Sequence, residues 1–149
     1  MASVYRPGRC ACATNGGVRS RTGDPAPRPD LVERARPLLP AGSVIHQVLI
    51  YQTAPSFAFF VLTYVTGLTA WNGYRCVAVT QDAVHVLESS KSSGGGRPRR
   101  LLATLPRRTR LGPVSGRWGR LHLLGERGWV HRRFHDQITA ADGAAGFTD

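Results

Sequence analysis

Residues 74–88 read YRCVAVTQDAVHVLE and carry the clearest β-strand signal in the chain. Two runs rich in β-branched residues, 74–80 and 84–87, flank the short break Gln81-Asp82-Ala83. Runs of this kind on either side of turn-forming residues are typical of an antiparallel hairpin. Cys76 lies inside the first run, so we expect it to be a small buried core residue. The hairpin predicts a fold that is mainly β.

On the N-terminal side of this hairpin, the segment SVIHQVLIYQ (43–52) predicts another strand, because β-branched and aromatic residues dominate it. The apolar run 57–70 that follows fits neither a strand nor a helix period well. Two short strands, or one strand with a loop, are expected there. Asn72-Gly73 then supplies a turn signal before the hairpin begins.

On the C-terminal side, 89–96 reads as a flexible Ser/Gly-rich loop, and 100–105 predicts a strand that ends at Pro106. A second hairpin is expected between 118–124 and 129–133. With Glu126 and Arg127 as its loop, Leu123 would face Val130, and His122 would face His131. This pair of histidines is the best-placed candidate for metal ligands, although solvated or hydrogen-bonded histidines are the simpler interpretation.

From Phe134 onward the spacing of apolar residues becomes helical. Phe134, Ile138 and Ala141 share one face, and Asp136 lies near the positive N-terminal end of the predicted helix. The helix is expected to end at Gly143 or Gly146. The complete pattern is about seven short strands followed by one amphipathic helix.

The first thirty residues are poor in large apolar side chains and rich in Gly, Pro and Arg. Such a segment cannot bury enough apolar area to offset the entropy of ordering, so 1–30 is expected to be a disordered basic tail. Residues 31–42 are expected to form a short helix and linker, with Asp30 as the cap, and 43–145 the folded domain. Cys10 and Cys12 lie in the tail without the further ligands that a structural zinc site needs.

The chain has a formal charge of +11, which is concentrated in one region. Twelve basic residues, and Glu126 as the only acid, lie between Lys91 and Arg133. All the basic residues except Lys91 are Arg, which reflects either selection for bidentate anion contacts or the codon usage of a GC-rich genome. Six of them bracket one predicted strand and are expected to gather on one rim as an anion-binding surface. They are Arg97, Arg99, Arg100, Arg107, Arg108 and Arg110.

Three segments, YRCVAVTQDAVHVLE, RPRRLLATLPRRTRLGP and GERGWVHRRFHDQITAAD, resemble in order and spacing an uncharacterised actinobacterial branch of the bacterial pleckstrin-homology-like proteins. The resemblance covers roughly Leu38 to Asp142. It implies a curved antiparallel sheet of seven strands that forms a barrel, with the C-terminal helix plugging one end. It says little about function, because this fold hosts lipid, peptide and protein binding alike.

The chain departs from eukaryotic pleckstrin-homology domains, in which Lys and Arg in and beside the loop between the first two strands bind phosphoinositides. The matching stretch here, 55–73, contains no basic residue. Inositide binding is therefore not implied. An apolar loop at this place could instead dock on a bilayer or a partner through Phe57, Phe59, Phe60 and Trp71. The alternative is that the apolar side chains of this stretch pack inside the barrel.

No catalytic motif, cofactor fingerprint or metal-ligand set is recognisable, and the acids are not spaced for acid/base chemistry. We therefore expect a binding module without enzymatic activity, cofactor or small-molecule substrate. Its expected partner is an acidic protein or an anionic membrane surface. The alternative is sequence-independent binding of nucleic acid by the arginines, with Trp118 or Trp129 as stacking surfaces.

The uncharged run 56–71 is shorter than a membrane-spanning helix and begins far from the N-terminus, unlike a signal peptide. A cytoplasmic location is therefore expected, with attachment to the membrane surface as an option. The odd number of cysteines gives no indication of disulfides.

Overall fold

A computed structural model describes residues 28–54, 56–66, 73–90 and 96–147, apart from the side chains of 60, 63 and 64. The predicted tail lies outside the described residues as far as residue 27, together with Cys10 and Cys12. Trp71 and most of the predicted Ser/Gly loop also lie outside them.

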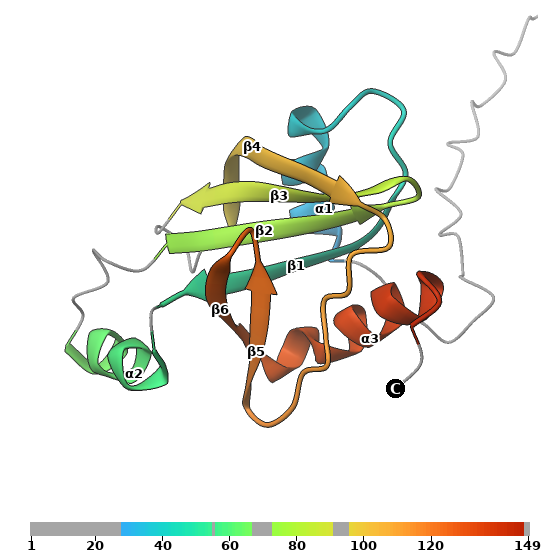
Figure 1. Cartoon of the computed structure of the whole chain (residues 1–149). Helices are drawn as coiled ribbons and strands as arrows, with labels where there is room; N and C mark the ends of the chain where they lie inside the picture. Colours follow the sequence, from blue (N-terminus) through green and yellow to red (C-terminus); the bar gives the residue numbers. More distant parts are fainter. Residues whose placement is uncertain (1–27, 55, 67–72, 91–95, 148–149) are drawn as a thin grey trace, which may run out of the picture.

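The described strands form one antiparallel sheet of six strands in the order β4-β3-β2-β1-β6-β5 (Figure 1). Together with the C-terminal helix, this confirms a mainly β fold. The sheet is open in the described part of the chain, where β4 and β5 are its two edges. The strands are β1 (Ile45–Thr53), β2 (Gly73–Thr80), β3 (Ala83–Ser90), β4 (Arg97–Pro106), β5 (Trp118–Leu123) and β6 (Glu126–His131).

The β2–β3 hairpin forms as its sequence predicts. Val79 pairs with Val84 across the ladder. The Thr80 hydroxyl closes the turn, because it donates to the Ala83 carbonyl (3.0 Å) and accepts from the Ala83 amide (3.2 Å). Cys76 is fully buried, as expected, and burial raises the pKa of its thiol to about 12. It is a core residue with little thiolate character.

The second hairpin has a different register from the predicted one. Leu124 and Gly125 both have positive φ, at 55° and 74°, so they form the two-residue turn. Glu126 is therefore the first residue of β6 and pairs with Leu123. His131 faces Trp118 instead of His122, which removes the predicted histidine pair.

A short seam joins this hairpin to the rest of the sheet. β1 and β6 pair only at Tyr51–Val130, Gln52–Trp129 and Thr53–Gly128. Gly128 lies so close to the Tyr51 ring that an added Cβ would overlap ring carbons Cδ2 and Cε2. Arg75 on β2 reinforces the seam by a two-pronged ion pair with Glu126, with N–O distances of 3.1 and 3.2 Å.

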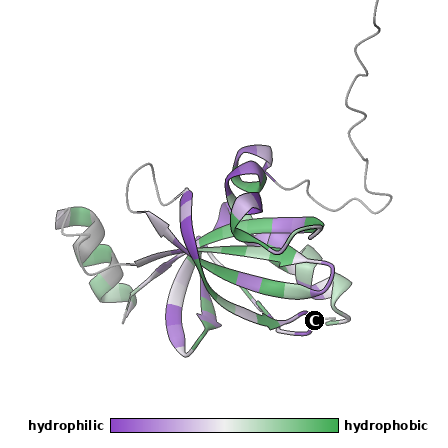
Figure 2. Cartoon of the chain, turned by 90° about the horizontal axis from the view of Figure 1, so that it is seen from above, coloured by the Kyte–Doolittle hydropathy of each residue, from purple (hydrophilic) through white to green (hydrophobic). Residues whose placement is uncertain are grey.

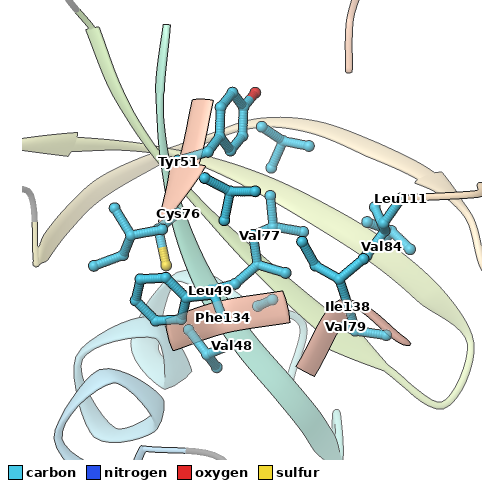
Figure 3. Packing of buried hydrophobic residues seen from close by; sticks show 14 of the residues in the cluster. Val48, Leu49, Tyr51, Cys76, Val77, Val79, Val84, Leu111, Phe134 and Ile138 are labelled. Atoms are coloured by element: carbon cyan, nitrogen blue, oxygen red, sulfur yellow. The ribbon is translucent and has the colours of Figure 1, made fainter. Parts of the chain in front are cut away.

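Two helices cover the sheet and share one core with it (Figure 3). α1 (Pro29–Ala35), continued by the 3-10 turn η1 (Arg36–Leu38), buries Leu31 and Ala35. It begins one residue earlier than predicted, with Pro29 in its first turn, and Asp30 makes no capping hydrogen bond. Proline at a first helical position is favourable because that N–H has no partner in the helix.

The C-terminal helix α3 (His135–Ala144) follows the 3-10 turn η4 (Arg132–Phe134). Phe134, Ile138 and Ala141 are buried, which confirms the predicted apolar face. Asp142 fixes the end of the helix to the β4–β5 connection, because its carboxylate accepts from the amides of Leu111 (2.9 Å) and Gly112 (2.7 Å). Figure 3 shows Ile138 of this helix among the strand residues Val79 and Val84.

We predict that Gly128→Ala destabilises the fold by about 1–3 kcal/mol, because the new methyl group overlaps the Tyr51 ring. The matched control is Gly143→Ala in α3, where an added Cβ meets no atom within 4 Å. That change should be neutral or stabilise by up to about 1 kcal/mol. Urea unfolding of both variants measures the difference, and equal stabilities would contradict the close Gly128–Tyr51 contact.

Candidate docking surface

The apolar segment after β1 forms a helix, α2 (Phe57–Thr66), where strands were expected. Ser56 starts it in the manner of an N-cap, because its hydroxyl accepts from the Phe59 amide (3.1 Å). Thr66 closes its last turn with a hydrogen bond to the Leu62 carbonyl (2.7 Å). A helix satisfies its own backbone groups, which an apolar segment without a strand partner cannot otherwise do.

α2 exposes large apolar side chains along its length. Val65 is 77% exposed, Leu62 59%, Phe57 46% and Val61 41%. Residues 56–66 contain no charged side chain, so the helix has no solvated charged face. Both views of the molecule show α2 standing away from the sheet (Figures 1 and 2), and the hydropathy colours of Figure 2 show apolar residues on it. Helices of this composition are normally covered by protein or lipid.

The described contacts between α2 and the body of the domain lie at the base of the helix. The Thr53 hydroxyl donates to the Gly73 carbonyl and accepts from its amide, both at 3.0 Å, which clamps the two strands that flank the helix. The Ala54 amide donates to the Arg127 carbonyl (3.2 Å). The Phe57 ring lies 5.0 Å from that of Trp129, centroid to centroid.

Side chains at the base of α2 form a small cluster separate from the main core. Ala54 and Trp129 are buried there, and Phe59 and Trp118 pack partly against them. Of the four predicted docking residues, Phe57 is exposed, although it touches Trp129, and Phe59 is half-buried. The Phe60 side chain and Trp71 lie outside the described part of the structure. Phe57, Phe59 and Val61 do not enter the main core, so packing inside a barrel does not account for them.

Three of the six predicted anion-binding arginines lie at the same end of the sheet as α2. α2 follows the end of β1. The end of β1 pairs with the start of β2, the start of β2 pairs with the end of β3, and the end of β3 pairs with the start of β4. Arg97 is exposed, Arg99 donates to the Ser90 hydroxyl (3.4 Å), and Arg100 forms an ion pair with Glu88 (2.6 Å). Arg97 and Arg99 therefore lie on this rim without an acidic partner in the described residues.

The other three predicted anion-binding arginines lie at the far end of β4, so the six arginines do not form the expected single cluster. They are Arg107, Arg108 and Arg110. The ten residues of β4 span about 30 Å at roughly 3.3 Å per residue, which separates the two groups. Arg107 donates to the Ala141 carbonyl of α3 (3.1 Å), and the Arg110 guanidinium lies 5.9 Å from the Phe147 ring centroid. Arg108 is exposed there. The six arginines were expected to gather because they flank one strand in the sequence. The strand is too long for its two ends to lie close together.

Two arginines that sequence analysis did not single out flank the base of α2. Arg120 lies over the Trp129 ring, 5.6 Å from its centroid, and the carbonyl of Arg127 receives the Ala54 amide. The signal that could have located them is the turn at Leu124-Gly125, which sets Arg120 opposite Trp129. We define the α2 rim as α2 with Arg97, Arg99, Arg100, Arg120 and Arg127.

Trp129 is a poor stacking surface for a nucleic-acid base. It is 7% exposed and is covered by Phe57 and Arg120. Its position, between the strand seam and α2, is that of a support for the helix.

The described residues contain no group of three His, Cys, Asp or Glu side chains arranged to hold a metal ion. Among the described helices, none combines the length and apolar character needed to cross a bilayer.

We predict that Trp129→Ala costs about 3–5 kcal/mol of folding stability, because it removes the largest side chain of the cluster that supports α2. Trp129→Phe keeps an aromatic ring at the site and should lose clearly less. Equilibrium denaturation of the two variants gives the comparison. An alanine variant as stable as the parent would mean that the cluster does not support the fold.

Comparison with known proteins assigns no relative to this arrangement: no family model, curated protein or solved structure matches the chain.

Proposed function

We propose that this chain is a non-catalytic docking module that binds an anionic membrane surface through the α2 rim. The observation that carries the proposal is the exposure of Phe57, Val61, Leu62 and Val65 on a helix without charge. Arg97 and Arg99 lie at the same end of the sheet and have no acidic partner among the described residues. Apolar contact and positive charge on one rim are the two signals that together give stable attachment to a membrane surface.

The free energies expected from apolar burial and from the arginines indicate that the two contributions act together. Completing the burial of four side chains that are roughly half-exposed is worth about 3–6 kcal/mol in total, at roughly 1.5–3 kcal/mol for each full burial. Each arginine near an anionic bilayer adds about 1 kcal/mol. Ordering and immobilisation oppose both gains, so neither signal alone is expected to hold the protein firmly.

The chain connectivity supports a pleckstrin-homology-like fold as part of this proposal. Four strands follow one another as neighbours, β6 returns to pair with β1, and a helix ends the domain. α2 occupies the connection between the first two strands, which is the place of the inositide-binding loop in eukaryotic domains. The absence of basic residues from 55–73 argues for a different contact at this connection.

The carboxylates support a binding role over catalysis. Glu88 and Glu126 are engaged in ion pairs with Arg100 and Arg75, and Asp142 is used by the backbone amides of the β4–β5 connection. Each has a structural partner that explains its position. An acid or base for catalysis would instead need to face a substrate.

The test is co-sedimentation of the full chain with phosphatidylcholine vesicles and with vesicles that also contain phosphatidylserine. We expect strong binding only to the anionic vesicles, and weaker binding as salt is raised. Leu62→Asp should weaken binding at least tenfold, because a charge in the bilayer costs up to about 3 kcal/mol and about 1.4 kcal/mol is a factor of ten.

Matched controls separate docking from general charge effects. Thr139→Asp adds the same charge at an exposed position on α3 and should change vesicle binding far less than Leu62→Asp. Replacing Arg97 and Arg99 by Gln should weaken binding more than replacing Arg107 and Arg108 by Gln at the other end of β4. Equal effects of Leu62→Asp and Thr139→Asp would contradict docking through α2. Binding of an acidic protein without any vesicle binding would assign the rim to a protein partner instead.

A further inference from the structure

A groove of about 280 Å³ lies on the sheet, and Trp129 is one of the residues that line it. Its lining includes alternate residues of several strands, which share one face of the sheet. Ile50 and Gln52 of β1, Tyr74 of β2 and Trp118 of β5 line its floor together with Trp129, and His131 and Arg133 add basic side chains to the lining. The groove is therefore largely aromatic and apolar, with two basic side chains.

Two guanidinium groups lie over the ring of Phe134, which lines the groove. Arg133 lies over the ring of Phe134 at 4.8 Å from its centroid, and Arg28 lies over the same ring at 5.2 Å. Burial, and then the nearby positive charge of Arg28, lower the pKa of Arg133. Among the described residues neither arginine forms an ion pair, so the repulsion between them is not relieved by a carboxylate.

His131 is surrounded by further cations. Its Nδ1 atom accepts from the Arg133 amide (3.3 Å), and its ring lies edge-on to Trp118 with centroids 4.9 Å apart. Burial lowers the pKa of His131, and Arg133, Arg117, Arg132 and His135 lower it further. No described carboxylate lines the groove. The nearest strand acids, Glu88 and Glu126, are engaged by Arg100 and Arg75.

We infer that this groove binds an organic phosphate, with the phosphate between Arg28, Arg133 and His131 and the organic part against Trp118 and Tyr74. Guanidinium groups bind phosphate oxygens through paired, charge-assisted hydrogen bonds, and a phosphate relieves the repulsion between neighbouring cations. The aromatic floor favours a flat or apolar organic part. The groove is at the small end of ligand sites, which suits one headgroup or one nucleotide.

This inference is independent of membrane docking, because the exposed residues of α2 do not line the groove. It rests on the aromatic floor, on the two guanidinium groups over the Phe134 ring and on the neighbouring His131 ring. A lipid headgroup and a free nucleotide both offer the required chemistry, so the experiment has an arm for each.

The probe is phenyl phosphate, titrated into the ¹⁵N-labelled full chain and followed by the indole N–H signal of Trp118. Phenol and inorganic phosphate, each of which offers one half of the probe, are the controls. We expect saturable binding of phenyl phosphate, at least tenfold tighter than that of either control.

Arg133→Gln, and separately Arg28→Gln, should weaken phenyl phosphate binding at least tenfold. Arg108→Gln removes the same charge from an exposed position at the far end of β4 and should leave binding unchanged. Thermal unfolding identifies any variant that fails to fold, and the second groove variant then decides the outcome. Equal weakening by all three changes, or no saturable shift with phenyl phosphate, would overturn the inference.

Glycerophosphoserine and adenosine monophosphate distinguish the two sources. Tighter binding of glycerophosphoserine would assign the groove to a lipid headgroup, and tighter binding of adenosine monophosphate would assign it to a nucleotide. Either result supports binding of an organic phosphate. Leu62→Asp should bind phenyl phosphate as the parent does. The groove and the α2 rim can therefore fail independently.

Discussion

The three-pair seam between β1 and β6 is the constraint on which both candidate surfaces depend. It forms because Gly128 leaves room for the Tyr51 ring and because Arg75 of β2 forms a bidentate ion pair with Glu126 of β6. The seam fixes Trp129 at the junction of the hairpin and the sheet. Phe57 of α2 packs against the Trp129 ring, and Trp129 also lines the aromatic groove. A shift of one residue at this seam would turn Trp129 to the opposite face.

The sequence was sufficient where local chemistry decides the structure. The β2–β3 hairpin follows from two β-branched runs and a turn that Thr80 closes, and α3 follows from the helical spacing of Phe134, Ile138 and Ala141. The approximate positions of β1 and β4 could also be predicted. In each of these elements, the local pattern of apolar, β-branched and turn residues is enough to indicate the element, although its packing partners lie elsewhere in the chain.

The predictions that were wrong concern segments whose structure depends on contacts between residues distant in sequence, or on a choice between helix and strand that the local sequence leaves open. Leu124 has an unfavourable positive φ, so its role as a turn residue is visible only once the seam has fixed the register. The aromatic and β-branched residues of 57–66 favour strands, but none of the described strands pairs with them, and Ser56 starts a helix. The six arginines were expected to bracket one strand and gather on one rim, but Arg97, Arg99 and Arg100 lie in β4 and the other three lie beyond its far end. The length of β4 therefore separates Arg97 from Arg108. The groove combines residues of four strands and η4, which no local pattern reveals.

In the proposed function, α2 is an exposed helix in water and becomes covered at an anionic membrane. Amide hydrogen exchange of residues 57–66, measured by mass spectrometry with and without phosphatidylserine-containing vesicles, tests it most directly. A ten-residue helix held only at its base should exchange rapidly in water, since short helices are marginal without packing. The account predicts strong slowing of exchange in 57–66 when the vesicles are added, with little change in α3. Slow exchange of 57–66 without vesicles, or slowing confined to other segments when they are present, would contradict it.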